Sequence, residues 1–140
     1  MVKHHKILIF ASGSGTNAEQ IIRHFSPNSS VEVLEVYSNN PSAFVLERAK
    51  QLGVSTHVFN REEFNNPEGL LKNVQAQSPD LIVLAGFLWK IPTHIIDAFP
   101  NKIINIHPAL LPKFGGKGMY GHHVHQSVID AKESESGISI

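Results

Sequence analysis

Two side chains that can stabilise a negatively charged oxygen and move a proton lie two residues apart, at Asn105 and His107. A carboxamide donates hydrogen bonds and an imidazole delivers or accepts a proton, and acyl transfer through a tetrahedral oxyanion requires both capabilities. Pro108 and Pro112 fix the backbone φ angle, so we expect a rigid loop after His107. The same residue types also cap strand ends and satisfy backbone groups, so this pattern alone leaves acyl transfer and a structural role equally open.

A second candidate site is the glycine-rich turn 12–17, with the sequence Ser-Gly-Ser-Gly-Thr-Asn. It lies directly between an apolar run and a helical pattern, so its glycines allow a tight turn and the free N–H groups of the helix attract an anion such as phosphate. We assign Gly13, Gly15, Thr16 and Asn17 as substrate-binding candidates, the last two through side-chain donors. The alternative is a plain helix entry capped by Asn17.

The same turn is close to two other phosphate-binding motifs. Gly13-x-Gly15-x-x-Ala18 approaches the dinucleotide fingerprint, which requires an acidic residue about 20 positions further on, at the end of the second strand. That strand ends in the polar segment 38–40 instead, and we expect Glu35 inside the sheet or along its edge, which weakens the case for a nicotinamide enzyme. No Gly-Lys-Ser/Thr ends the turn, so an ordinary P-loop is excluded.

Strands and helices must position these candidates, and the sequence alternates between the two patterns. Short, β-branched apolar runs at 7–10, 31–36, 81–84 and 103–106 are typical of strands buried on both faces. Helical periodicity occupies the intervals between them, in 17–25, 45–52 and 70–74, with Gly53 as a helix stop. We therefore predict an α/β protein with an open, mostly parallel, Rossmann-like sheet and helices on both faces.

In such a sheet, ligands bind beyond the carboxyl ends of the strands. If residues 102–106 form a strand, Asn105 and His107 point to the same side at that edge.

Composition limits the possible functions. At 140 residues the chain has the length of one domain, and its 12 basic residues balance its 12 acidic ones. Nothing in this charge favours nucleic acid or a membrane surface, so a bound phosphate has to be held locally. The chain contains no cysteine, which excludes thiolate zinc sites, and the apolar run 7–11 is too short for a signal-peptide core or a membrane span. We expect a soluble, cytoplasmic protein.

Taken together, the motifs resemble the glycinamide ribonucleotide formyltransferase family. Asn105-x-His107-Pro108-x-Leu110-Leu111-Pro112, the turn 12–17 and the segment 83–87 are similar to that family, as are residues 38–39 and 46–49. Formyltransferases acting on methionyl-tRNA or nucleotide sugars, and formyltetrahydrofolate hydrolases, have related segments, but the proline directly after the histidine points to the purine enzyme. The resemblance implies formyl transfer from 10-formyltetrahydrofolate to the amino group of glycinamide ribonucleotide, without a metal, by a monomer or homodimer.

The resemblance also implies individual roles. Residues 15–17 bind the phosphoribosyl end of the substrate, and Asn105 and His107 are catalytic. The strand after residues 85–87 borders the folate, and the residues implied to bind it are Arg61, Leu88, Trp89, Lys90, Ile91 and Asn105. Trp89 is a departure, because relatives often have a basic residue at that position.

Two features depart from the family pattern. The family uses an aspartate in a later loop, whereas this sequence ends at Ile140 within what looks like the next strand, 137–140. We therefore expect 1–140 to be a single N-terminal, nucleotide-binding domain that is poorly active on its own; a formyltetrahydrofolate hydrolase and an inactive nucleotide-binding domain are the alternatives. The segment 115–121 is longer than in other family members, so we expect a differently shaped loop.

Three of the nine histidines, His122, His123 and His125, crowd the start of the last predicted helix. A zinc site that combines them with His107 is conceivable, yet no Asp, Glu or Cys lies at ligand spacing. The resemblance instead places His123 and His125 in the loop and helix that follow the active site.

Overall fold

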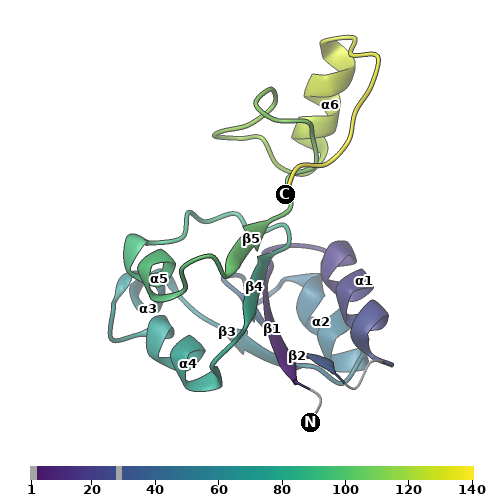
Figure 1. Ribbon diagram of the computed structural model, residues 1–140. Coiled ribbons are helices and arrows are strands. Elements are labelled where there is room, and N and C mark those ends of the chain that lie inside the picture. Colours follow the sequence, from purple (N-terminus) through teal and green to yellow (C-terminus); the bar gives the residue numbers. More distant parts are fainter. Residues whose placement is uncertain (1–2, 28–29) are drawn as a thin grey trace. The chain divides into compact units, whose positions relative to one another are not determined.

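The computed structural model describes residues 3–27 and 30–140, so the domain predicted over 1–140 also includes four residues outside the described ones. Strands and helices alternate along the described chain (Figure 1). The strands are β1 (His5–Phe10), β2 (Val31–Ser38), β3 (Ser55–Val58), β4 (Leu81–Leu84) and β5 (Ile103–Asn105). The helices are α1 (Thr16–Phe25), α2 (Phe44–Gln51), α3 (Arg61–Asn65), α4 (Leu70–Gln77), α5 (Thr93–Ala98) and α6 (His122–Asp130).

The strands form one sheet in the order β3-β2-β1-β4-β5. Strand β1 pairs in parallel with β2 and β4, and β2 pairs in parallel with β3. Phe10, at the end of β1, lies opposite Tyr37 of β2 on one side and Leu84 of β4 on the other. The chain therefore leaves these three strands at the same edge of the sheet. The predicted α/β class with an open parallel sheet is confirmed.

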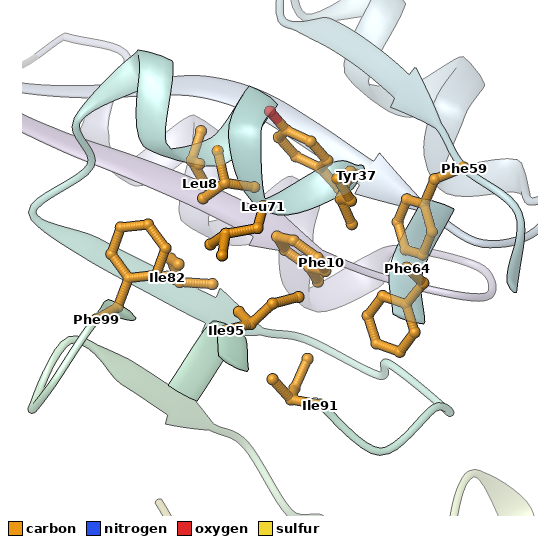
Figure 2. Packing of buried hydrophobic residues seen from close by; sticks show 12 residues of the cluster. Leu8, Phe10, Tyr37, Phe59, Phe64, Leu71, Ile82, Ile91, Ile95 and Phe99 are labelled. Atoms are coloured by element: carbon orange, nitrogen blue, oxygen red, sulfur yellow. The ribbon is translucent and has the colours of Figure 1, made fainter. Parts of the chain in front are cut away.

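Helices cover both faces of this sheet: α1 and α2 lie on one side and α3, α4 and α5 on the other (Figure 1). Leu8 and Phe10 belong to a buried core with residues of α3, α4 and α5, and Figure 2 shows Phe10 between Tyr37 and Ile95 in that core. Ile7 and Ile9 are equally buried, and because successive side chains alternate along a strand they face the side of α1 and α2. Burial on both faces explains why residues 7–10 of β1 and the whole of β4 are continuous apolar runs.

Most of the predicted elements are present with small shifts at their ends. Helices α1, α2 and α4 occupy the three predicted helical intervals, and β1, β2, β4 and β5 coincide with the four apolar runs. Three elements were not predicted, namely β3, α3 and α5. Strand β3 is half-exposed at the sheet edge, and α5 has six residues, so neither has a clear apolar period.

Two compact units divide the chain, residues 1–104 and 105–140, and each is described by itself below. In the second unit, the strand expected over residues 137–140 does not form, so that prediction is wrong. Only Ser139 takes part in pairing there, through an isolated antiparallel bridge to His107. Within residues 3–27 and 30–140, no helix has the length and apolar character needed to cross a membrane.

Candidate active site

The glycine turn opens α1 in a conformation that only glycine adopts readily. Gly15 is the N-cap, with φ 77° and ψ 24° in the left-handed region, and a Cβ added there would overlap the side chain of Val45. Because a glycine cap has no side chain, the predicted alternative of an Asn17 cap is wrong. Thr16 and Asn17 are both exposed in the first turn of α1, so their side chains and N–H groups are open to solvent.

Helix α2 holds this turn in place from the side. The N–H of Val45 donates to the Gly13 carbonyl at 3.0 Å, and Nε of Arg48 donates to the Ser14 carbonyl at 2.7 Å. The Arg48 guanidinium also pairs with Glu19 of α1 at 2.5 Å. Two hydrogen bonds from α2 therefore fix the path of a turn whose glycines would otherwise be flexible, and the ion pair with Glu19 joins α2 to α1.

Glu19 accepts from a second arginine, Arg23, one helical turn further on. The hydrogen bond from Arg23 and the positive charges of Arg48 and Arg23 hold the pKa of the Glu19 carboxyl below its ordinary value. Glu19 is therefore a carboxylate at neutral pH and keeps Arg48 beside the turn.

Ser12 lies two residues after the end of β1 and connects the glycine turn with the ends of two other strands. Its hydroxyl donates to Oδ1 of Asn39 at 2.6 Å and accepts from the N–H of Leu88 at 2.9 Å, while its own N–H donates to the Gly86 carbonyl at 3.1 Å. Only 5% of Ser12 is exposed. These bonds bring together the ends of β1, β2 and β4, as expected for the carboxyl edge of a parallel sheet.

Residues 86–91 form a loop with bends, so the strand expected after residues 85–87 is wrong in this structure. Leu88 is 52% exposed and Lys90 is also exposed, whereas Ile91 is buried in the core beneath α5. The side chain of Ile91 is thus occupied by packing. Of the predicted folate-binding residues in this loop, Leu88 and Lys90 offer side chains and Ile91 offers backbone groups.

Trp89 packs into an aromatic cluster with Phe59, Phe64 and Phe87 at centroid distances between 5.4 and 6.5 Å. The guanidinium of Arg61 lies over its ring. Arg61 is the first residue of α3, where Asn60 and Glu63 form a capping box that fixes the helix start. The structure therefore brings Arg61 and Trp89 together, although they are 28 positions apart (89 − 61).

Asn105 and His107 lie at the start of the second unit. Asn105 ends β5 and is exposed, and His107 is half-buried outside the strand, in the bridge to Ser139. The strand predicted over residues 102–106 is shorter than expected and ends at Asn105, and His107 pairs with Ser139 outside it. That the Asn105 and His107 side chains point to one side stays a prediction.

The His107 ring has a defined hydrogen-bond state. Its Nε2 lies 2.7 Å from the carbonyl oxygen of Phe114. Because a carbonyl only accepts, Nε2 must carry a proton, and Nδ1 is the nitrogen left for other partners. His107 is therefore oriented by the loop that follows it, in the way that a carbonyl orients many functional histidines.

The loop after His107 is held by Ser139 and by a small core. The Ser139 hydroxyl donates to the Ala109 carbonyl at 2.7 Å and accepts from the Leu111 N–H at 3.0 Å. Ala109 is fully buried against Val124 and Val128 of α6. In the predicted loop 115–121, Gly116, Gly118 and Gly121 all have positive φ, as a chain of tight turns requires.

The three clustered histidines of α6, His122, His123 and His125, are exposed. The rings of His122 and His123 lie 4.1 Å apart, and Tyr120 contacts His123 edge-on. Within the described part of the chain, no group of three or more His, Cys, Asp or Glu residues is arranged to hold a metal ion.

A cavity of about 400 Å³ lies at the opposite, amino end of the sheet. Its lining includes His4 and Val31 at the starts of β1 and β2, and Leu52 after α2. None of the predicted site residues is among the residues that line it. We place the candidate site at the carboxyl edge, where the predicted residues of the first unit gather.

Sequence reasoning included Ser12, Asn39 and Arg48 in its candidate segments but assigned none of them a supporting role. The signal for Ser12 and Asn39 was present, because both are polar residues placed directly after buried strands. The contact of Arg48 with Ser14 had no signal, since it joins residues 34 positions apart through a side chain on a neighbouring helix.

The fold and these strand-end loops define an α/β protein with a parallel Rossmann-like sheet and a glycine turn at its carboxyl edge. Comparison with known families narrows the class: residues 5–140 match the formyl transferase family model. The chain therefore belongs to the formyl transferase family.

Individual relatives agree with this assignment. The chain is 35% identical over 144 residues to the chloroplastic phosphoribosylglycinamide formyltransferase of Arabidopsis thaliana, and the match covers 99% of this chain and 49% of that protein. It is 33% identical over 139 residues to the phosphoribosylglycinamide formyltransferase of Escherichia coli, covering 96% of this chain and 63% of that protein. The chain thus spans half to under two thirds of the length of these curated relatives.

A solved structure shows the same similarity in three dimensions. The phosphoribosylglycinamide formyltransferase of Brucella melitensis superposes with a TM-score of 0.85 at 33% identity, covering 97% of this chain and 71% of that one. The fold predicted from the sequence is therefore the fold of known phosphoribosylglycinamide formyltransferases.

Proposed function

We propose that the protein transfers a formyl group from 10-formyltetrahydrofolate to the amino group of glycinamide ribonucleotide, a step of purine synthesis. One observation carries this proposal. Relatives named phosphoribosylglycinamide formyltransferase are 33% to 36% identical to the chain across 96% to 99% of it. We further propose that 1–140 is the N-terminal, nucleotide-binding part of that fold. The same names give no support to the hydrolase or to an inactive domain.

The phosphoribosyl end of glycinamide ribonucleotide is assigned to the glycine turn. Gly13 is exposed, Gly15 shapes the turn, and Thr16 and Asn17 have solvent-facing donors at the start of a ten-residue helix. N–H groups and the positive end of a helix favour a phosphate dianion. The bracing of this turn by α2 supports the assignment, because a preorganised site loses less entropy on binding.

The folate is assigned to Arg61, Leu88, Trp89, Lys90, Ile91 and Asn105. Arg61 and Lys90 are exposed cations at the sheet edge, suited to an anionic cosubstrate. Ile91 contributes through its backbone, since its side chain is buried. The Arg61 guanidinium that lies over Trp89 provides a positive charge near the position where the resemblance leads us to expect a basic residue.

The proposed reaction needs one bond formed and one broken. The amine nitrogen attacks the formyl carbon, negative charge builds on the formyl oxygen, and the carbon–nitrogen bond to folate breaks. Asn105 donates to the developing oxyanion, and His107 acts from Nδ1 because Nε2 is bonded to the Phe114 carbonyl. With a proton on Nδ1 as well, His107 donates to the oxyanion and passes this proton to the departing folate nitrogen, and the freed Nδ1 then accepts the proton that the attacking amine loses.

The test is an assay of tetrahydrofolate release by the purified protein, with and without glycinamide ribonucleotide. The proposal expects release that depends on the amine, with formyl-glycinamide ribonucleotide as the second product. Equal release without the amine, accompanied by formate, would identify a hydrolase and overturn the proposal.

Variants connect this activity with the proposed residues. Asn105→Ala is expected to lower kcat by about 10² to 10³, the usual effect of removing an oxyanion donor. His107→Gln is expected to lower kcat as well, because Gln has no proton to deliver. His24→Gln is the control, since His24 is exposed at the end of α1. Full kcat in the Asn105 and His107 variants would remove both residues from the mechanism.

A cytoplasmic location and a monomeric or homodimeric state belong to the same proposal. Cell fractionation and light scattering of the native protein test them, and a membrane-bound fraction or a larger oligomer would contradict them.

A further inference from the structure

The buried hydroxyl of Ser12 joins the loop proposed to bind the nucleotide with the loop proposed to bind the folate. Ser12 is the first residue of the glycine turn, and its hydrogen-bond donor Leu88 is the first residue of the loop 86–91 that we propose to bind folate. A second bond, from the Ser12 N–H to the Gly86 carbonyl, joins the same two segments. These segments are 76 positions apart in the sequence.

The direction of this hydrogen-bond chain is fixed by chemistry. The Leu88 N–H can only donate, so Ser12 Oγ accepts there and its own proton is directed to Oδ1 of Asn39. The Asn39 amide is thereby oriented with its oxygen toward Ser12 and its NH₂ group away. All donors in this chain of hydrogen bonds therefore point the same way, from Leu88 through Ser12 to Asn39. Hydrogen bonds aligned in this way strengthen one another.

Burial makes these bonds costly to break separately. Ser12 is 5% exposed, so water cannot readily replace a lost partner, and an unpaired buried polar group is unfavourable. Movement of the Leu88 backbone would take the N–H from its acceptor and leave the buried Ser12 hydroxyl with its bond to Asn39 alone. The two loops are therefore expected to become ordered together.

We propose that Ser12 is a positioning residue that couples the two substrate subsites, so that binding of the nucleotide at the glycine turn raises the affinity for folate at residues 88–91. The inference rests on the proposed function for the identity of both ligands. Ordering of one loop by its ligand reduces the entropy that the other ligand has to overcome, which produces positive coupling. Linkage requires the effect to be reciprocal, so folate raises the affinity for the nucleotide by the same factor.

Titration calorimetry on the full protein tests this coupling. The affinity for a folate analogue that lacks the formyl group is measured with and without saturating glycinamide ribonucleotide, and then in the reverse order. We expect a factor of about 5 to 150 in the unmodified protein, the same in both directions. In Ser12→Ala the factor is expected to fall to about 1, while each ligand alone still binds.

Ser38→Ala is a matched control. Ser38 is also a fully buried serine at a strand end, but its hydroxyl bonds only to Asn40, within its own loop, at 3.2 and 3.3 Å. Its loss is expected to leave the coupling factor unchanged. Asn39→Ala is the second variant in case Ser12→Ala does not fold, and it is expected to reduce the coupling by removing the acceptor of the Ser12 proton.

The outcomes separate the inference from the proposed function. Binding of both ligands without coupling, or with equal coupling in Ser12→Ala, overturns the inference and leaves formyl transfer intact. Failure of both ligands to bind overturns the proposed function. In that case amide hydrogen exchange, with inorganic phosphate as the ligand, still tests the inference. We expect phosphate to slow exchange of the Leu88 N–H in the unmodified protein but not in Ser12→Ala. An equal effect of phosphate on exchange in both proteins overturns the inference.

Discussion

The guanidinium carbon of Arg61 lies 3.7 Å from the centroid of the Trp89 ring. The indole also contacts the rings of Phe59, Phe64 and Phe87, so its neighbours are a cation and an apolar cluster. A guanidinium at this distance is attracted to the negative face of the ring and remains able to bond to an anion through the N–H groups that lie in its own plane. The pair therefore places a cation beside the proposed folate loop.

The Arg61–Trp89 contact is expected to contribute about 0.5–1 kcal/mol, the usual value at an exposed site. A double-mutant cycle with Arg61→Met and Trp89→Leu measures it from urea unfolding curves. Since Trp89 is the single tryptophan in the chain, the emission spectrum of Arg61→Met also reports on the contact directly. Additive effects of the two substitutions, with an unchanged spectrum, would show that the stacking does not exist in solution.

Gly15→Ala is expected to destabilise the protein by about 2 kcal/mol or more, because it combines a left-handed backbone with overlap of Val45. Gly13→Ala is the control: a Cβ there meets nothing within 4 Å, and its effect is expected to stay within about 0.5 kcal/mol. Chemical denaturation compares the two. Similar losses for both variants would mean that the close approach of Gly15 to Val45 is incorrect.

Arg48→Met is expected to lower Tm by about 4 °C or more, since it removes the bond to the Ser14 carbonyl and the contact with Glu19. Arg23→Met removes the other arginine on Glu19, but Arg23 is 60% exposed, so its effect on Tm is expected to be below about 2 °C. Calorimetry gives both values. In phosphate-binding assays Arg48→Met is also expected to weaken binding at the turn, and a larger effect from Arg23→Met would reverse this ranking.

Asp80 gives the stability a dependence on acid pH. The N–H of Lys6 donates to its carboxylate at 2.8 Å, and this bond, assisted by the charges of His5 and Lys3, holds the pKa of Asp80 below its ordinary value. A lowered folded-state pKa stabilises above the unfolded pKa of about 4, and the contribution is lost as the pH falls through the folded value.

Asp80→Asn retains an oxygen acceptor for Lys6 but cannot titrate, so its stability is expected to fall less steeply than that of the unmodified protein below about pH 4. Denaturation midpoints measured across acid pH test this. Asp97→Asn, at an exposed position of α5, is expected to leave the profile unchanged. Identical profiles for Asp80→Asn and the unmodified protein would contradict the assignment.

Much of the sheet was predictable because both of its faces are buried. Runs such as 7–10 and 81–84 have no polar interruption, and the stripe of α1 repeats at helical spacing. Strand β3 was not predictable, since it pairs only with β2 at the edge and its sequence Ser-Thr-His-Val does not alternate clearly. Helix α3 did have a signal, the Asn60 and Glu63 spacing of a capping box.

The candidate site was predictable as a set of residue types and not as a geometry. Strand order places Ser12 and Leu88 at one edge, but the bond between them depends on the bends of the loop 86–91. The pairing of His107 with Ser139 and the bond of its ring to Phe114 likewise depend on turns whose dihedral angles no local pattern specifies. Residue identity decides what chemistry is available, and loop conformation decides which atoms remain free to perform it.

The loop 86–91 is fastened at two points, by the bond of Leu88 to Ser12 and by the burial of Ile91. Between Leu88 and Ile91 the path of the main chain is therefore fixed independently of the side chains. Leu88 and Lys90 point into solvent and are not needed to maintain that path. Substitutions at these two positions can therefore accumulate during evolution without moving the peptide groups, and a recognition surface built from those peptide groups tolerates such drift.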